Sequence, residues 1–232
     1  MSGVFVTGTD TGIGKTVASC ALLRALRAAG VPSAPMKPVA AGAQLHDGQW
    51  LNEDVEALVA AADRPDLDRH LVCPNLYIEA IAPHIAAGRE TRIVDLDAVT
   101  RAFAELERKG DFVVVEGVGG FKVPLGAQFD SVDLARALGL PVVLVVGMKL
   151  GCLNHALLTQ DAIAAAGLKL AGWIANEIDP DMRAIEENVD ALAARLGAPL
   201  IARFPHVSEL SIVHLADLVG VDPLLATLER RG

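Results

Sequence analysis

The chain has 232 residues, with 29 acidic and 20 basic side chains and a formal net charge of −9. This balance argues against a nucleic-acid-binding protein, which needs a basic face, but it is compatible with a local positive pocket for a nucleotide. Hydrophobic residues make up 52% of the chain, enough for one well-packed core, so we predict a single domain over residues 1–232.

Short apolar runs alternate with stretches of helical spacing. In chain order, the sequence predicts strands over 4–7, 33–39, 112–115, 142–146, 170–175 and 200–204, and helices over 17–29, 54–62, 96–109, 131–138, 154–166 and 181–196. Several of the strands are rich in valine and continuously apolar, which is typical of buried parallel strands. The alternation predicts an α/β fold with a mostly parallel central sheet and helices on both faces.

The segment between the first predicted strand and helix is rich in glycine and reads Gly8-Thr-Asp-Thr-Gly-Ile-Gly14-Lys15-Thr16. A strand, a glycine-rich loop and a helix form the context of a phosphate-binding loop, in which Lys15 would reach the β/γ-phosphates and the Thr16 hydroxyl would coordinate Mg²⁺. The usual pattern is G-x-x-x-x-G-K-S/T, whereas five residues separate Gly8 from Gly14. We predict a P-loop NTPase-like domain that binds a nucleoside triphosphate, with a merely structural turn as the alternative.

Charged residues stand near predicted strand ends, where ligands gather in open α/β sheets. Glu116 ends the 112–115 run and is either a second Mg²⁺ contact or an ordinary strand-end carboxylate. Lys37 either faces the phosphates or reaches the surface. Asn52 is a suitable helix N-cap and Asp54 suits the first turn, so the residues alone favour a capping role for Asp54.

The segment from Lys149 to His155 precedes a predicted helix, with Asn154 as its expected N-cap. Exposed N–H groups there would hold an anion such as a carboxylate, although a capped loop without a ligand is equally compatible with the sequence. Cys152 is expected to pack rather than act as a nucleophile. The six histidines show no metal-binding spacing.

The sequence also predicts a cytoplasmic protein without a membrane partner. The chain runs directly into its first predicted strand, which leaves no room for a signal peptide. Its longest apolar stretch, residues 138–148, is interrupted by Gly139 and Pro141 and is too short to span a bilayer. The three cysteines form no C-x-x-C pair, so reduced thiols are expected.

Taken together, these segments resemble the dethiobiotin synthetases, a family of ATP-dependent ring-closing enzymes. The matching motifs occur in order between residues 4 and about 176: Gly8-Thr-Asp-Thr with Gly14-Lys15-Thr16-Val17, Lys37-Pro-Val, Glu116-Gly-Val-Gly-Gly, the run from Val146 to His155, and Gly172-Trp-Ile-Ala-Asn176. The resemblance implies that 7,8-diaminononanoate, CO₂ and ATP react with Mg²⁺ present to give dethiobiotin, ADP and phosphate. The reaction would pass through a carbamate and a carbamic-phosphoric anhydride, in a homodimer with a shared substrate site.

The resemblance also implies residue roles. The catalytic residues would be Lys37, Lys15 and Thr11. The Mg²⁺ ligands would be Thr16, Asp54 and Glu116, so the resemblance favours a ligand role for Asp54 over the capping role that the residues alone favour. The ATP-binding residues would be Gly12, Ile13, Gly14, Lys15, Thr16, Val17, Asp54, Glu116, Gly117, Val118, Gly119, Asn176, Pro205, His206 and Val207. The substrate-binding residues would be Lys37, Ala41, Gly151, Cys152, Leu153 and Asn154. We expect Glu116→Gln to behave like Asp54→Asn.

Two positions depart from the family pattern. Ala41 stands where a hydroxyl residue is usual, so one substrate hydrogen bond is lost or made by water, and His206 stands where larger aromatic residues often lie. Two rival functions remain: another ATP-dependent amidating or cyclising ligase, or a regulatory P-loop ATPase of the kind that positions chromosomes and septa. The regulatory ATPases need a shorter loop with a lysine near its start, where this chain has Thr9 and Asp10.

Overall fold

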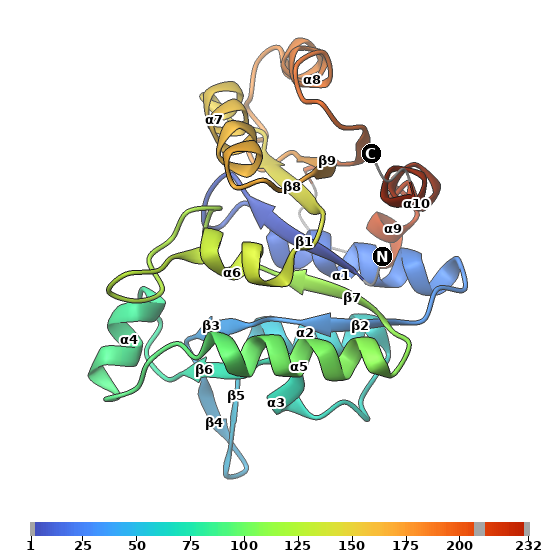
Figure 1. Cartoon of the computed structure of the whole chain (residues 1–232). Helices are drawn as coiled ribbons and strands as arrows, with labels where there is room; N and C mark the ends of the chain where they lie inside the picture. The colour runs from blue at the N-terminus through green and yellow to red at the C-terminus, as the bar shows by residue number, and fades with distance from the viewer. Residues whose placement is uncertain (1–2, 207–211, 230–232) are drawn as a thin grey trace.

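The computed structural model describes residues 3–206 and 212–229. Along this part of the chain the elements are β1 (Gly3–Gly8), α1 (Lys15–Ala28), β2 (Ser33–Met36), β3 (Val39–Ala41), β4 (Gln44–His46), β5 (Gln49–Leu51), α2 (Glu53–Ala62), α3 (Arg69–Val72), β6 (Asn75–Tyr77), α4 (Pro83–Arg89), α5 (Leu96–Arg108), β7 (Phe112–Glu116), α6 (Ser131–Leu138), β8 (Val142–Gly147), α7 (Cys152–Ala165), β9 (Leu170–Asn176), α8 (Ile185–Ala193), β10 (Leu200–Phe204), α9 (Ile212–Ala216) and α10 (Val221–Glu229). Figure 1 shows their arrangement around a central sheet.

Within the described residues the main sheet has six strands in the order β10-β9-β8-β1-β7-β2. Every neighbouring pair in it is parallel. Each strand corresponds to one of the predicted apolar runs, so the predicted α/β fold with a mostly parallel sheet is confirmed. Because the strands are parallel, their carboxyl ends meet at one edge, where the ends of β1, β7, β8 and β9 carry the predicted site residues.

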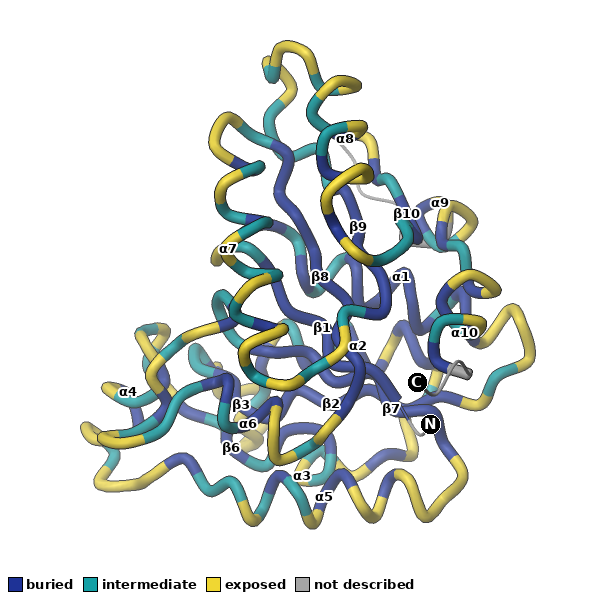
Figure 2. The backbone as a smooth tube through the Cα atoms, turned by 45° about the horizontal axis from the view of Figure 1, so that its top comes forward, coloured by how far each residue is buried: buried dark blue, intermediate teal, exposed yellow. Residues whose placement is uncertain are grey.

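The sheet is covered on both faces, and its strands are the most deeply buried part of the chain (Figure 2). Side chains along β1 alternate between the two sides. Val4 and Val6 pack with α1, α2, α9 and α10, whereas Phe5 packs with α5 and α6. A third cluster places α7 and α8 against β8 and β9.

The predicted strand over 33–39 is wrong in its second half. It leaves the main sheet after Met36, because the Lys37 N–H donates to Val72 O at 2.7 Å and Pro38 has no N–H to offer. The chain resumes as β3, which pairs with β6 in a separate two-stranded sheet. The antiparallel β4–β5 hairpin, which the sequence analysis did not predict, projects from the body of the molecule (Figure 1).

Two predicted helix starts are also wrong. The N-cap of α7 is Gly151, with a φ of 96° that glycine adopts without strain, so Asn154 lies inside the first turn rather than at the cap. Helix α8 begins only after Ala184, whose φ of 55° ends the preceding turn. Among the described helices, none combines the length and apolar character needed to cross a bilayer.

Candidate active site

The glycine-rich loop joins the end of β1 to the start of α1. Gly12 and Gly14 have φ values of 71° and 84°, in the left-handed region that favours glycine. A Cβ atom at Gly14 would also collide with the Asn176 side-chain nitrogen. The loop therefore requires glycine at this position for both its backbone conformation and its packing. Val17 follows in the first turn of α1 and packs against the hydrophobic cluster that contains Val4 and Val6.

Four side chains from different elements converge beside this loop. Thr16 Oγ1 lies 2.8 Å from Glu116 Oε1 and 3.0 Å from Asp54 Oδ1. Lys37 Nζ lies 3.1 Å from Asp54 Oδ2 and also donates to Glu116 Oε1. The structure thus brings these four side chains together from α1, the end of β2, the first turn of α2 and the end of β7.

The cluster holds a buried lysine in its charged form. Lys37 and Glu116 are both buried. Burial alone would lower the pKa of Lys37, but the carboxylates of Glu116 and Asp54 outweigh this effect and leave its pKa raised. Lys37 is therefore a cation fixed at the carboxyl edge of the sheet, not a surface lysine.

Lys15 is a second buried cation with a different environment. Its Nζ donates to the backbone oxygen of Asp10 at 2.8 Å. Burial lowers its pKa to about 8, with Lys37 adding to the decrease and nearby carboxylates opposing it. A buried ammonium group that faces a neutral carbonyl gains most from an incoming anion, because the anion restores the favourable interactions lost on burial.

The oxygen atoms around Thr16 fit a magnesium ion. Glu116 Oε2 is buried and has no hydrogen-bond partner within the described chain, so it has a lone pair to offer. Thr16 Oγ1 and the Asp54 carboxylate stand beside it, and hard oxygen donors are what Mg²⁺ prefers. Residues 3–206 and 212–229 contain no cluster of three or more His, Cys, Asp and Glu side chains that would cage a metal. One or two carboxylates completed by substrate phosphates are typical of Mg²⁺ sites.

The loop that follows β7 lies over the phosphate loop. Gly117 N donates to Val6 O at 2.9 Å, so the backbone turns over the end of β1. A Cβ atom at Gly119, whose φ is 64°, would come within 3.6 Å of Thr11 Oγ1. The structure therefore places Gly119 next to Thr11, and nucleotide binding by Gly117, Val118 and Gly119 remains a prediction.

The residues expected to contact the base lie at one edge of the site. Asn176 ends β9 and donates from Nδ2 to Ile13 O at 2.8 Å, which ties it to the phosphate loop. Pro205 and His206 are exposed after β10, and the His206 Nδ1 atom lies 3.3 Å from Glu177 O. Val207 lies outside the described residues. Base recognition by these residues remains a prediction.

The expected carboxylate-binding segment lies beside the phosphate loop of its own chain. Lys149 Nζ is 3.3 Å from Asp10 Oδ2. Gly151 caps α7, and Cys152, Leu153 and Asn154 form its first turn. Cys152 is buried and burial raises the pKa of its thiol, in agreement with a packing role.

Ala41 faces a cavity that the Asp54 carboxylate also lines. Its backbone oxygen accepts a hydrogen bond from Asn52 Nδ2 at 3.2 Å. Asn52 Oδ1 accepts the Val55 N–H at 3.3 Å and caps α2, as predicted, which leaves Asp54 free to face Thr16 and Lys37. Ala41 and Asp54 line a cavity of about 690 Å³.

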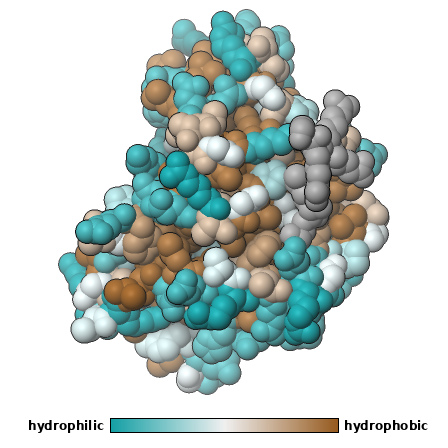
Figure 3. Space-filling view, in the orientation of Figure 1, coloured by the Kyte–Doolittle hydropathy of each residue, from teal (hydrophilic) through white to brown (hydrophobic). Residues whose placement is uncertain are grey.

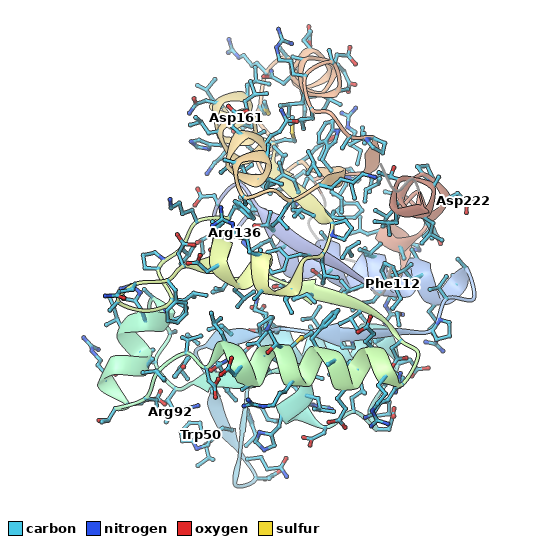
Figure 4. The ribbon with its side chains drawn as sticks, in the orientation of Figure 1. Trp50, Arg92, Phe112, Arg136, Asp161 and Asp222 are labelled. Atoms are coloured by element: carbon cyan, nitrogen blue, oxygen red, sulfur yellow. The ribbon has the colours of Figure 1, made fainter. Side chains whose placement is uncertain are left out.

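A second cavity of about 640 Å³ lies across the β4–β5 hairpin from this site. Trp50 and Arg92, labelled near the foot of the molecule in Figure 4, are among its lining residues. Arg92 stacks over the Tyr77 ring at 4.7 Å from the ring centre. Leu51, Asn52 and Glu56 contribute to both cavities.

Comparison with known proteins gives the family. A family model described as an AAA domain matches residues 2–213. The ATP-dependent dethiobiotin synthetase BioD of Aromatoleum aromaticum is 55% identical over 205 residues, which are 88% of this chain and 90% of the relative. The enzyme of the same name from Nitrosospira multiformis is 50% identical over 219 residues, 94% of this chain and 95% of the relative. The chain belongs to the dethiobiotin synthetase family. The resemblance and the prediction of an ATP-dependent ligase are thereby confirmed.

The solved structures similar to this dethiobiotin synthetase family member show its fold. MinD of Aquifex aeolicus matches 99% of this chain and 96% of its own, with 14% identity and a TM-score of 0.56. A ParA family ATPase of Chlorobium tepidum TLS matches 99% of this chain and 100% of its own, with 16% identity and a TM-score of 0.50. At these identities the likeness extends to the fold alone, and the predicted P-loop NTPase-like fold is confirmed.

Sequence reasoning missed one residue of the site. Asp10 receives hydrogen bonds from Lys15 and Lys149, yet we had considered it only as the residue standing where other P-loop ATPases carry a lysine. The signal was its position, since an acidic residue is unexpected in a loop that is predicted to bind phosphates.

Proposed function

We propose that this protein is an ATP- and Mg²⁺-dependent dethiobiotin synthetase of biotin biosynthesis, which converts 7,8-diaminononanoate, CO₂ and ATP into dethiobiotin, ADP and phosphate. The names of the relatives support ATP as a substrate and dethiobiotin as the product. The observation that carries the proposal is the convergence of Thr16 and Lys37 on the same two carboxylates, Asp54 and Glu116, beside the phosphate loop.

The proposed chemistry has three stages. One amine of the diamine attacks CO₂ and loses a proton to give a carbamate. A carbamate oxygen then attacks the γ-phosphorus of ATP, the bond to the bridging oxygen breaks, and ADP leaves. Finally the second amine attacks the carbonyl carbon of the mixed anhydride, phosphate leaves, and the ureido ring closes.

Both reacting partners of the second stage are anions, so the site must supply positive charge and fixed positions. In our proposal Lys15 binds the phosphates, and Lys37 and Thr11 orient the carbamate against the phosphoryl group. Mg²⁺ bound by Thr16, Asp54 and Glu116 would supply further charge. Because Ala41 has no hydroxyl group, the substrate hydrogen bond expected of a hydroxyl residue at this position would be lost or made by water.

The remaining parts of the proposal concern the adenine base, the number of domains and the cellular location. Asn176, with Pro205, His206 and Val207, would contact the adenine base. The six-stranded sheet shared by the described residues supports a single domain. All three cysteines are free and buried, which supports a reducing compartment and hence a cytoplasmic location.

Product detection tests this function. Purified protein incubated with diaminononanoate, bicarbonate, ATP and Mg²⁺ is expected to form dethiobiotin, identified by its mass, with one ADP released per product molecule. ADP formation is expected to require the diamine. ATP hydrolysis that ignores the diamine, with no dethiobiotin formed, would instead favour a regulatory ATPase.

We also propose that the working unit is a two-fold symmetric homodimer that shares its substrate sites, in which N–H groups at the start of α7 bind the substrate carboxylate. Leu150, directly before this helix, is 94% exposed, and Leu158 on α7 is also exposed. In Figure 3, which shows the face of the molecule seen in Figure 1, apolar side chains lie among polar ones over α6 and α7. Exposed apolar residues of this kind support a protein interface, and two-fold dimers are the commonest oligomers.

Mixing two inactive variants tests the shared site. One variant carries Lys15→Ala, and the other carries Gly151→Trp with Asn154→Trp. In a mixed dimer, one of the two shared sites would combine an intact phosphate loop from one subunit with an intact α7 start from the other. Activity is therefore expected to return after subunit exchange. Each variant exchanged with itself is the control. Because Lys149 already reaches its own phosphate loop, the alternative is a site made within one chain, and that arrangement would give no recovery.

A further inference from the structure

Asp10 places a carboxylate inside the phosphate loop. Its Oδ1 accepts the Thr11 N–H at 2.7 Å, and its backbone oxygen accepts from Lys15 Nζ at 2.8 Å. Its other carboxylate oxygen, Oδ2, lies 3.3 Å from Lys149 Nζ. The Thr11 N–H and Lys149 hold the pKa of Asp10 below its usual value, so the carboxylate is charged at neutral pH.

A charged carboxylate in this loop opposes the binding of a triphosphate, because like charges at short range repel. The carboxylate is nonetheless useful, since it fixes the Thr11 N–H and thereby the shape of the loop. A cation that cancels its charge would keep this benefit and remove the repulsion. Lys149 is the hydrogen-bonded cation at this position, whereas His155 acts on Asp10 only through space.

Stability alone does not account for the ion pair. The Lys149 and Asp10 side chains are 37% and 49% exposed. Ion pairs with this exposure contribute about 0–1 kcal/mol to folding. The pair joins two segments of different expected roles, the phosphate loop after β1 and the substrate-binding segment after β8.

We propose that Lys149 is a positioning residue for nucleotide binding: it neutralises Asp10 so that the phosphate loop accepts ATP. This inference rests on the proposed function, because it assumes that ATP binds at this loop. It assigns Lys149 a role through Asp10 and not through direct contact with ATP or the diamine.

A double-mutant cycle tests the inference. We expect Lys149→Met to weaken binding of Mg²⁺ and a non-hydrolysable ATP analogue about tenfold, which corresponds to about 1.4 kcal/mol. Adding Asp10→Asn to that variant is expected to restore the affinity to that of Asp10→Asn alone, because no carboxylate then remains to be neutralised. Lys149→Arg is expected to bind like the unmodified protein. Calorimetry gives the affinities, and steady-state kinetics are expected to show the Lys149→Met defect mainly in KM for ATP.

Lys109→Met is the matched control. Lys109 is 39% exposed and lies 3.9 Å from Glu105 Oε1, so this variant removes a similar ion pair outside the site. Circular dichroism checks that every variant is folded. If the weakened binding persists in the double variant, Lys149 contacts the ligand directly and the inference is wrong.

Unchanged binding in Lys149→Met overturns the inference as well. The proposed function is tested separately by the unmodified protein. Failure of that protein to bind the analogue contradicts both proposals, whereas binding without dethiobiotin formation contradicts the proposed function alone.

Discussion

Replacing Lys15 with alanine is expected to lower kcat about 10³-fold or more, because the change removes a cation held where negative charge develops during phosphoryl transfer. The melting temperature is expected to change little. Lys15 is buried, and its hydrogen bond goes to a neutral carbonyl, so its loss also removes an unfavourable buried charge. Diamine-dependent ADP release measures the rate, and thermal denaturation measures the stability.

The control for this variant is Lys109→Ala, which removes a partly exposed lysine far along the chain from the phosphate loop. It should retain full activity. Near-normal activity in Lys15→Ala would show that the glycine-rich loop does not bind the transferred phosphates, and it would leave the loop as a structural turn.

Asp54→Asn and Glu116→Gln are both expected to raise the Mg²⁺ concentration needed for half-maximal activity by about tenfold or more, because each replaces a charged oxygen donor with a neutral one. Activity measured across a Mg²⁺ titration gives this value. If Asp54 contributes only charge to the first turn of α2, the Asp54→Asn titration will match that of the unmodified protein. Asn52 caps the helix in either case.

The two variants are expected to differ in stability, which changes the sequence-based expectation that they behave alike. Glu116 is fully buried against Lys37, whereas the Asp54 side chain is 46% exposed. Removing one member of a buried ion pair costs about 3–5 kcal/mol, and Asp54 remains to face Lys37, so we expect about 3 kcal/mol for Glu116→Gln. Asp54→Asn should cost less than 1 kcal/mol. Urea denaturation measures both, and equal losses would contradict the burial argument.

Much of the fold was predictable because its signals are local. The main-sheet strands are mostly apolar, several of them continuously so, and the phosphate loop is one contiguous motif between a strand and a helix. The coincidence of Lys37, Glu116 and Asn176 with strand ends was enough to place them at one edge of the sheet. The motifs then supplied the family, which the relatives confirm.

The missed features depend on contacts between distant segments. Strands β3, β4, β5 and β6 have three residues each, too few to show a period. Lys149 contacts Asp10 because β8 lies next to β1 in the sheet. The order of strands in a sheet cannot be predicted from residue spacing along the chain. The start of α7 shows a different limit, since Asn154 and Gly151 are both suitable near a helix start and only the backbone conformation decided between them.

The position of β1 in the sheet has a consequence for how the chain folds during synthesis. Gly3 pairs with Val113, and Phe5 pairs with Val142, so this central strand has no main-sheet neighbour until segments more than one hundred residues later have left the ribosome. At typical rates of about 5–20 residues per second, that wait lasts roughly 5–25 s. An unpaired apolar strand is prone to aggregation during such a delay. Nascent chains of this protein should therefore depend on chaperone binding until β7 and β8 emerge.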